Sequence, residues 1–215
     1  AHDQKSLPAL IVPGIRQMLI RLSGKEKAKA AAHRGLSVLK GFVKHLRVKI
    51  GEVEIGLEPE RGTADSGDLE ADLPELFVVL GEAAKAANWP IAIMVDELQY
   101  LSTAEFSALI MAIHKVNQQD LPVIVIGAGL PQILGLAGNS KSYAERLFTF
   151  SHIGALTRQD AIEAIAKPAK EEGVSFMPTA IDEIIKRTDG YPYFIQQWAY
   201  EAWNYAENSP IPLSA

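Results

Sequence analysis

The chain has 215 residues, of which 48% are hydrophobic and 22% are charged, and it contains no cysteine. This composition is too apolar for a wholly disordered chain. The missing cysteine excludes disulfides, thiol catalysis and Cys-ligated zinc, and it suits a cytoplasmic protein. The net charge is −5, but residues 1–50 carry 11 Lys and Arg against 2 Asp and Glu, whereas the remaining residues carry 10 against 24.

The basic block, residues 1–50, has two interpretations. It could bind nucleic acid or another anionic partner, or it could be the solvated face of Lys- and Arg-rich helices that faces the acidic remainder. The second is favoured, because Phe42 is the only aromatic residue of the block and stacking on nucleobases needs aromatic platforms. No membrane span is expected, since the longest charge-free stretch, residues 121–140, is interrupted by proline and glycine.

Apolar spacing in the first part of the chain predicts a helix that opens at Pro13 and Gly14 and a second helix over Glu26–Leu39. Between Phe42 and Leu57, apolar residues alternate on both sides of Gly51, which predicts a β-hairpin over residues 42–57. An exposed loop is expected over residues 58–72. The next predicted helix is Leu73–Ala87, with Pro74 in its first turn.

Two short apolar runs, residues 90–95 and 121–126, predict a parallel sheet. They lack polar alternation, which is typical of strands buried on both faces. The helix predicted between them, Thr103–Asn117, completes a strand–helix–strand unit and indicates an α/β fold. A short strand is expected over Phe148–Ile153. Three helices should follow: one capped by Thr157 and ending near Glu172, then Pro178–Thr188 and Pro192–Ala206. We therefore expect an α/β domain over residues 1–155 and a small all-helical domain over residues 156–215.

The strongest motif is an acidic pair, Asp96-Glu97, directly after the apolar run Ile91–Val95. Open parallel sheets bind ligands at the carboxyl ends of their strands. In P-loop nucleotidases an aspartate at this place helps to hold Mg²⁺, and an adjacent glutamate can activate the attacking water. The alternative is that both acids simply end the strand at the solvent boundary.

The order of these elements and several motifs resemble the AAA+ superfamily of P-loop ATPases, and within it the bacterial and archaeal ATPases related to the STAND group. The motifs are Ile93–Tyr100, Val123–Pro131, Tyr143–Phe148 and Thr188–Gln196. The resemblance implies a parallel-sheet P-loop core followed by a helical lid, which together bind ATP and Mg²⁺ and hydrolyse ATP. It implies that Asp96 holds the metal and that Glu97 is catalytic.

The resemblance also implies roles for three further residues. Gly190 and Pro192 match the G-x-P motif of STAND lids, whose proline packs on adenine, although the same pair is common where one helix ends and the next begins. Arg146 stands where many AAA+ proteins carry an arginine finger for a neighbouring subunit, which would imply a homo-oligomer. A surface ion pair is the alternative for Arg146. The aromatic residues between Tyr191 and Trp203 are expected in the core of the lid, with a partner-binding surface as the alternative.

The sequence departs from the AAA+ pattern in two ways. It contains no G-x-x-x-x-G-K-[ST] motif, so we expect the core to be incomplete at its N-terminus, the chain to start after its P-loop, and these residues alone to be inactive. In addition, Gly127-Ala128-Gly129 offers no polar side chain after the second strand. The alternative function is a nucleotide-independent scaffold that binds nucleic acid or a protein partner through residues 1–50.

Overall fold

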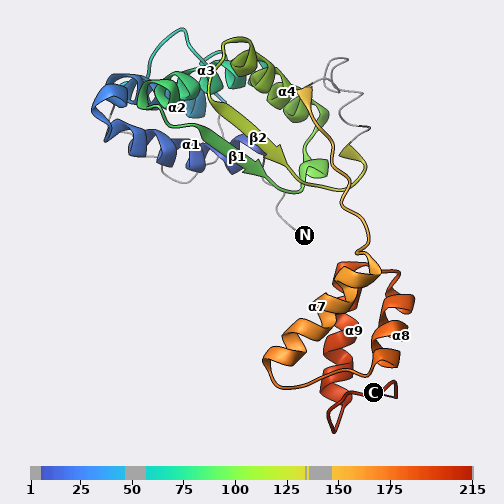
Figure 1. Ribbon diagram of the computed structural model, residues 1–215. Helices are drawn as coiled ribbons and strands as arrows, with labels where there is room; N and C mark the ends of the chain where they lie inside the picture. The colour runs from blue at the N-terminus through green and yellow to red at the C-terminus, as the bar shows by residue number, and fades with distance from the viewer. Residues whose placement is uncertain (1–5, 47–56, 134, 136–146, 215) are drawn as a thin grey trace. The chain divides into compact units, whose positions relative to one another are not determined.

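The computed structural model describes residues 6–46, 57–133, 135 and 147–214. The chain divides into two compact units, residues 1–149 and 150–215, and each is described by itself. The first unit combines helices with a two-stranded parallel sheet, and the second is built from three helices (Figure 1). In the part of the chain that the structure describes, no helix is long and apolar enough to cross a membrane.

Two helices open the first unit: α1 (Leu7–Ser23) and α2 (Lys29–His45), joined by a 3-10 turn over Glu26–Ala28. α1 starts well before the predicted Pro13, which lies inside it. The reason is that helical apolar spacing already begins at Leu7, and these residues form one buried face. That face consists of Leu7, Ile11, Val12, Ile15, Leu19 and Leu22.

The β-hairpin predicted over residues 42–57 is wrong at its start. Phe42 and Val43 belong to α2, and Phe42 is fully buried in the core. Phe42 follows Val38 and Leu39 at intervals of four and three residues, so it continues the buried face of a helix instead of starting a strand. Residues 47–56, the rest of the predicted hairpin, lie outside the described residues.

α3 (Leu69–Ala87) is the central helix of the first unit, in contact with α1, α2 and α4. It begins before the predicted Leu73 because Asp68 caps it: the Asp68 side chain accepts a hydrogen bond from the Glu70 N–H at 3.1 Å. Pro74 therefore lies inside the helix, beyond the first turn in which it was predicted.

The sheet consists of β1 (Ile91–Val95) and β2 (Val123–Gly127), which pair in parallel and are connected through α4 (Thr103–Gln118). Figure 1 shows the two strands side by side with their arrowheads at the same edge. One face is buried, because Ile91, Ile93, Val95 and Val123 join a core shared with α1–α4.

The prediction that both strands are buried on both faces is wrong. On the second face Met94 is 77% exposed, and Ile124 and Ile126 are 58% and 50% exposed. The helices α1–α4 cover one side of the sheet, and the apolar runs supply apolar side chains to both sides. A run without polar alternation therefore does not by itself show that both faces are covered.

The short strand predicted over Phe148–Ile153 is also wrong. These residues form neither helix nor strand. A strand needs a hydrogen-bonded neighbour, and the sheet found among the described residues contains β1 and β2 alone. The segment spans the division between the two units, at residues 149 and 150.

The second unit packs α7 (Arg158–Glu171), α8 (Pro178–Thr188) and α9 (Pro192–Tyr205) around a small core. The predicted cap of the first of these helices is confirmed, since Thr157 Oγ1 accepts from the Asp160 N–H at 3.2 Å. The start and end of α8 are as predicted, and α9 ends one residue before the predicted Ala206.

The aromatic residues predicted in the core of this unit lie at its surface. Ile195 is the buried residue of α9, and Ala199, Ala202 and Ala206 pack partly against the same core. This narrow side of small residues lets α9 approach α7 and α8 closely and leaves the larger rings outside. Each of the rings is at least 36% exposed: Tyr191, Tyr193, Phe194, Trp198, Tyr200 and Trp203.

Candidate functional site

The predicted acidic pair lies at the carboxyl edge of the two-stranded sheet. Because Val95 pairs with Gly127, both strands end at the same level, and the segments that follow them run next to each other. The Ala128 N–H donates to the Val95 carbonyl at 2.9 Å, and the Leu98 N–H donates to the Ala128 carbonyl at 3.0 Å. Backbone hydrogen bonds thus hold the loop after β2 against the turn that carries the acids.

Glu97 has an unusual backbone conformation, with φ +57° and ψ +40° in the left-handed region. For a residue other than glycine this conformation costs about 1 to 2 kcal/mol. Ala64, Asn88, Asp120 and Asp189 also have a positive φ. Ala64 lies in the loop before α3, and the other three follow the end of a helix, where a positive φ is common. Glu97 instead stands between a strand and a 3-10 turn, η2 (Leu98–Tyr100). Strain of this kind outside helix ends is concentrated at functional sites.

Asp96 and Glu97 are both exposed, and the Asp96 Oδ1 accepts a hydrogen bond from the Glu97 N–H at 2.8 Å. Within the described ranges, no group of three or more His, Asp or Glu side chains could hold a metal ion. Mg²⁺ needs no such group, because it keeps several waters and is commonly bound by one or two carboxylates together with substrate phosphates. The donor set at this edge fits that mode of binding.

Gln99 connects the acidic pair to the loop after β2. Its Nε2 donates to Glu97 Oε2, and its Oε1 accepts from the Leu130 N–H at 3.0 Å. No role was predicted for Gln99 from the sequence. Its position two residues after Glu97 is visible in the sequence, but the contact with Leu130 depends on the register of the two strands.

Glu105 fixes the start of α4 just beyond this turn. Its carboxylate accepts from the Ser102 N–H at 2.9 Å and from Ser102 Oγ at 2.7 Å in a capping box. It also accepts from the Leu7 N–H at 2.7 Å and so ties the start of α1 to the start of α4. Partial burial opposes ionisation, but the hydrogen bonds from Ser102 and Leu7 outweigh it and lower the pKa of Glu105.

Replacing Glu105 by glutamine is expected to make stability less sensitive to acid. The ordinary pKa of a glutamate side chain is 4.5, and the pKa of Glu105 in the folded chain is lower. The stability that the ionised carboxylate contributes is therefore fully present above about 4.5 and is lost as the pH falls through the folded pKa. Urea unfolding between pH 3 and pH 7 measures this effect. Unfolding free energy should fall less steeply towards low pH in Glu105→Gln than in the wild type, and equal slopes would contradict the assignment.

Gly190 and Pro192 form the junction between α8 and α9. Asp189 takes the left-handed cap of α8, Gly190 also has a positive φ of +72°, and Pro192 begins α9. A Cβ on Gly190 would lie 2.9 Å from the Leu156 carbonyl oxygen, and the Gly190 carbonyl accepts from the Leu156 N–H. A glycine is therefore required here for the packing of the second unit. Arg146, the predicted finger, lies outside the described residues.

Part of the basic block is neutralised within the first unit. Arg34 pairs with Glu60 at 3.1 Å and with Glu82 at 2.9 Å, and the Lys40 ammonium donates to the Leu57 carbonyl. Lys25 lies over the Trp89 ring, 5.1 Å from its centroid. Among these contacts, the two ion pairs of Arg34 support the interpretation that basic helices face acidic segments of the same chain.

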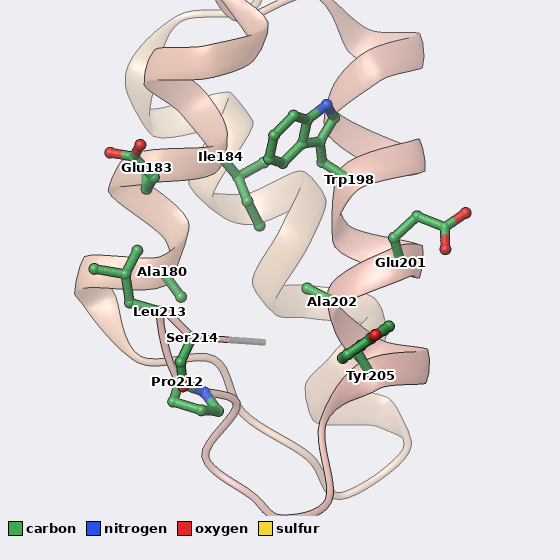
Figure 2. A pocket seen from close by; sticks show the side chains of 10 residues that line it. All are labelled: Ala180, Glu183, Ile184, Trp198, Glu201, Ala202, Tyr205, Pro212, Leu213 and Ser214. Atoms are coloured by element: carbon green, nitrogen blue, oxygen red, sulfur yellow. The ribbon is translucent and has the colours of Figure 1, made fainter.

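The second unit contains a pocket of about 370 Å³ between α8, α9 and the C-terminal residues (Figure 2). Its charged lining residues are Glu183 and Glu201, whose carboxylates point away from the centre in Figure 2, and no Lys or Arg lines it. Such a lining supplies no cation to neutralise a phosphate group.

Comparison with known proteins gives no relative: no family model, no curated protein and no solved structure matches this chain.

Proposed function

We propose that the chain is part of the ATP-binding and ATP-hydrolysing module of a switch or motor of the AAA+ and STAND type, and that it is inactive without a phosphate-binding loop. The observation that carries this proposal is the exposed Asp96–Glu97 pair at the carboxyl edge of β1, with Glu97 in a left-handed conformation. Open parallel sheets bind ligands at this edge, and backbone strain clusters at active sites, so a strained acidic residue here supports a role in chemistry.

Each acid has one role in this proposal. Asp96 holds Mg²⁺ through water, and Glu97 orients the attacking water and accepts its proton as a general base. The metal, when bound, neutralises charge on the phosphates of ATP. Gly190 and Pro192 contribute the junction of the lid that contacts adenine, and Arg146 is the candidate for a finger in a neighbouring subunit. The phosphate-binding loop is taken to come from outside these 215 residues, which contain no such motif.

The Mg²⁺ dependence of ATP hydrolysis by the full-length natural protein tests this proposal. Asp96→Asn should raise the Mg²⁺ concentration needed for half-maximal rate about tenfold, because a neutral amide holds the hydrated ion more weakly than a carboxylate. Asp68→Asn is the matched control, since Asp68 is an exposed helix cap at which asparagine serves equally well. An unchanged Mg²⁺ dependence in Asp96→Asn would overturn the metal assignment and favour the nucleotide-independent scaffold.

A further inference from the structure

We propose that Gln99 is a positioning residue that couples the orientation of the Glu97 carboxylate to the loop after β2, residues 128–131. The catalytic consequence rests on the proposed function. The coupling itself rests on contacts within the first unit, namely the Gln99 Nε2 bond to Glu97 Oε2 and the bond from the Leu130 N–H to Gln99 Oε1.

The chemistry of the two partners fixes which way the Gln99 amide faces. A carboxylate can only accept, so it requires the NH₂ end of the amide, and a backbone N–H can only donate, so it requires the oxygen. Both requirements are met at once in one orientation. If the amide turned over, both contacts would become unfavourable. The side chain therefore acts as a two-ended link between Glu97 and Leu130.

The backbone around Gln99 is held on both sides. Leu98 is 7% exposed and donates to the Ala128 carbonyl, and the Tyr100 N–H donates to the Glu97 carbonyl at 3.0 Å. With the backbone of η2 fixed, the remaining freedom of Gln99 is rotation of its side chain, and the two hydrogen bonds limit that rotation.

Two glycines make room for this arrangement. A Cβ on Gly129 would lie 2.4 Å from Gln99 Oε1, and a Cβ on Gly127 would lie 2.2 Å from Leu98 Cδ1. Residues 127–129 themselves carry at most a methyl group. The Gln99 amide, which belongs to the neighbouring turn, thus supplies a polar side-chain group at this loop. Residues 127–129 have no polar side chains, and their small size leaves the space that Gln99 occupies.

A functional consequence follows from the link. If the loop after β2 shifts so that the Leu130 N–H leaves Gln99 Oε1, Glu97 alone holds the Gln99 amide, and both side chains gain rotational freedom. Orientation of a general base within hydrogen-bond reach of its water decides how well it works. A change in the loop would therefore change the activity of Glu97 without altering the affinity for ATP.

The coupling is tested by hydrogen exchange of the Leu130 amide in the full-length protein, followed by NMR after labelling with ¹⁵N-leucine. Gln99→Ala should speed exchange about tenfold, since it removes the acceptor of the Leu130 N–H. Glu97→Ala should also speed exchange, about threefold, because Gln99 loses its anchor. Gln197→Ala is the matched control: it removes a similar amide–carboxylate bond, from Gln197 to Glu201, and should leave Leu130 unchanged.

A second variant separates the two ends of the link. Gln99→Glu keeps an oxygen for the Leu130 N–H but places a negative charge against Glu97, so Leu130 exchange should stay within twofold of the wild type. In the full-length ATPase both Gln99 variants should lower kcat about tenfold and leave KM for ATP within twofold. Unchanged Leu130 exchange in both Gln99→Ala and Glu97→Ala would overturn the coupling.

Failure of this inference and failure of the proposed function give different results. If Glu97→Gln abolishes hydrolysis but both Gln99 variants keep the wild-type kcat, the positioning role is wrong and the proposed function stands. If Glu97→Gln leaves hydrolysis unchanged, the proposed function is wrong, and the Leu130 exchange rates alone decide whether Gln99 couples the two segments.

Discussion

Glu97→Gln is expected to lower the rate of ATP hydrolysis by the full-length protein about 10²- to 10³-fold and to leave ATP binding within twofold of the wild type. Glutamine has nearly the same shape as glutamate and keeps an oxygen for the Gln99 amide, but it cannot accept a proton from water. Steady-state phosphate release gives the rate, and equilibrium titration with ATP gives the affinity.

Glu171→Gln is the matched control for this substitution, because Glu171 is an exposed residue of the last turn of α7. It should leave both the rate and the affinity unchanged. A Glu97→Gln protein that hydrolyses ATP at the wild-type rate would show that the acidic pair is only the solvent-facing end of a strand. The combination of lost hydrolysis and retained binding separates a role in chemistry from a role in binding.

Asp72→Asn is expected to lower the free energy of unfolding by about 2 to 3 kcal/mol. Asp72 is 3% exposed; its Oδ1 accepts from the Ser66 N–H at 3.1 Å and from Ser66 Oγ at 2.7 Å, and its Oδ2 accepts from the Gly67 N–H at 2.8 Å. Asparagine has one oxygen in place of two, so its buried amide nitrogen must face one of these donors. Urea unfolding at neutral pH measures the loss.

The same substitution at Asp68 provides the comparison, since Asp68 lies in the same segment but is exposed and asparagine caps a helix equally well. Its unfolding free energy should stay within about 0.5 kcal/mol of the wild type. Equal effects of Asp72→Asn and Asp68→Asn would mean that the three hydrogen bonds to Asp72 do not organise the loop before α3.

Local signals in the sequence were sufficient for several elements. β1 and β2 were predicted because each apolar run is short and is bounded by turn residues. α7 and α8 were predicted from a capping pattern at Thr157 and a proline at the start of α8. In these segments the apolar period and the end signals agree, and the structure has the same element in the same place.

Predictions failed where local spacing fits two structures or where burial depends on distant packing. Phe42 stands between the helical spacing set by Val38 and Leu39 and the alternating apolar residues from Leu46 onwards. Its place in the core of the first unit decides for the helix. The exposure of Met94 depends on which side of the sheet the helices cover. In α9 the sequence shows many large rings, but the small residues Ala199 and Ala202 face the core.

The candidate site, too, could be predicted only in part from the sequence. That Asp96 and Glu97 stand at the end of a strand follows from the sequence, since they directly succeed an apolar run. The left-handed conformation of Glu97 and the two-ended contact of Gln99 do not, because both depend on how the turn fits against the loop after β2. The sequence does show Gly127 and Gly129, but the need for glycine there becomes clear only when Leu98 and Gln99 are placed beside them.

The location of the bound nucleotide is the most direct test of this account. Mn²⁺ can replace Mg²⁺ with ATP, and the paramagnetic ion broadens the NMR signals of nearby amides. In the full-length protein, Mn²⁺ with ATP should broaden the amides of residues 96–99 and 128–130 much more strongly than those of Ile91 and Val123, at the other end of the same strands. Sharp signals at residues 96–99 in the presence of bound Mn²⁺ and ATP would contradict the account.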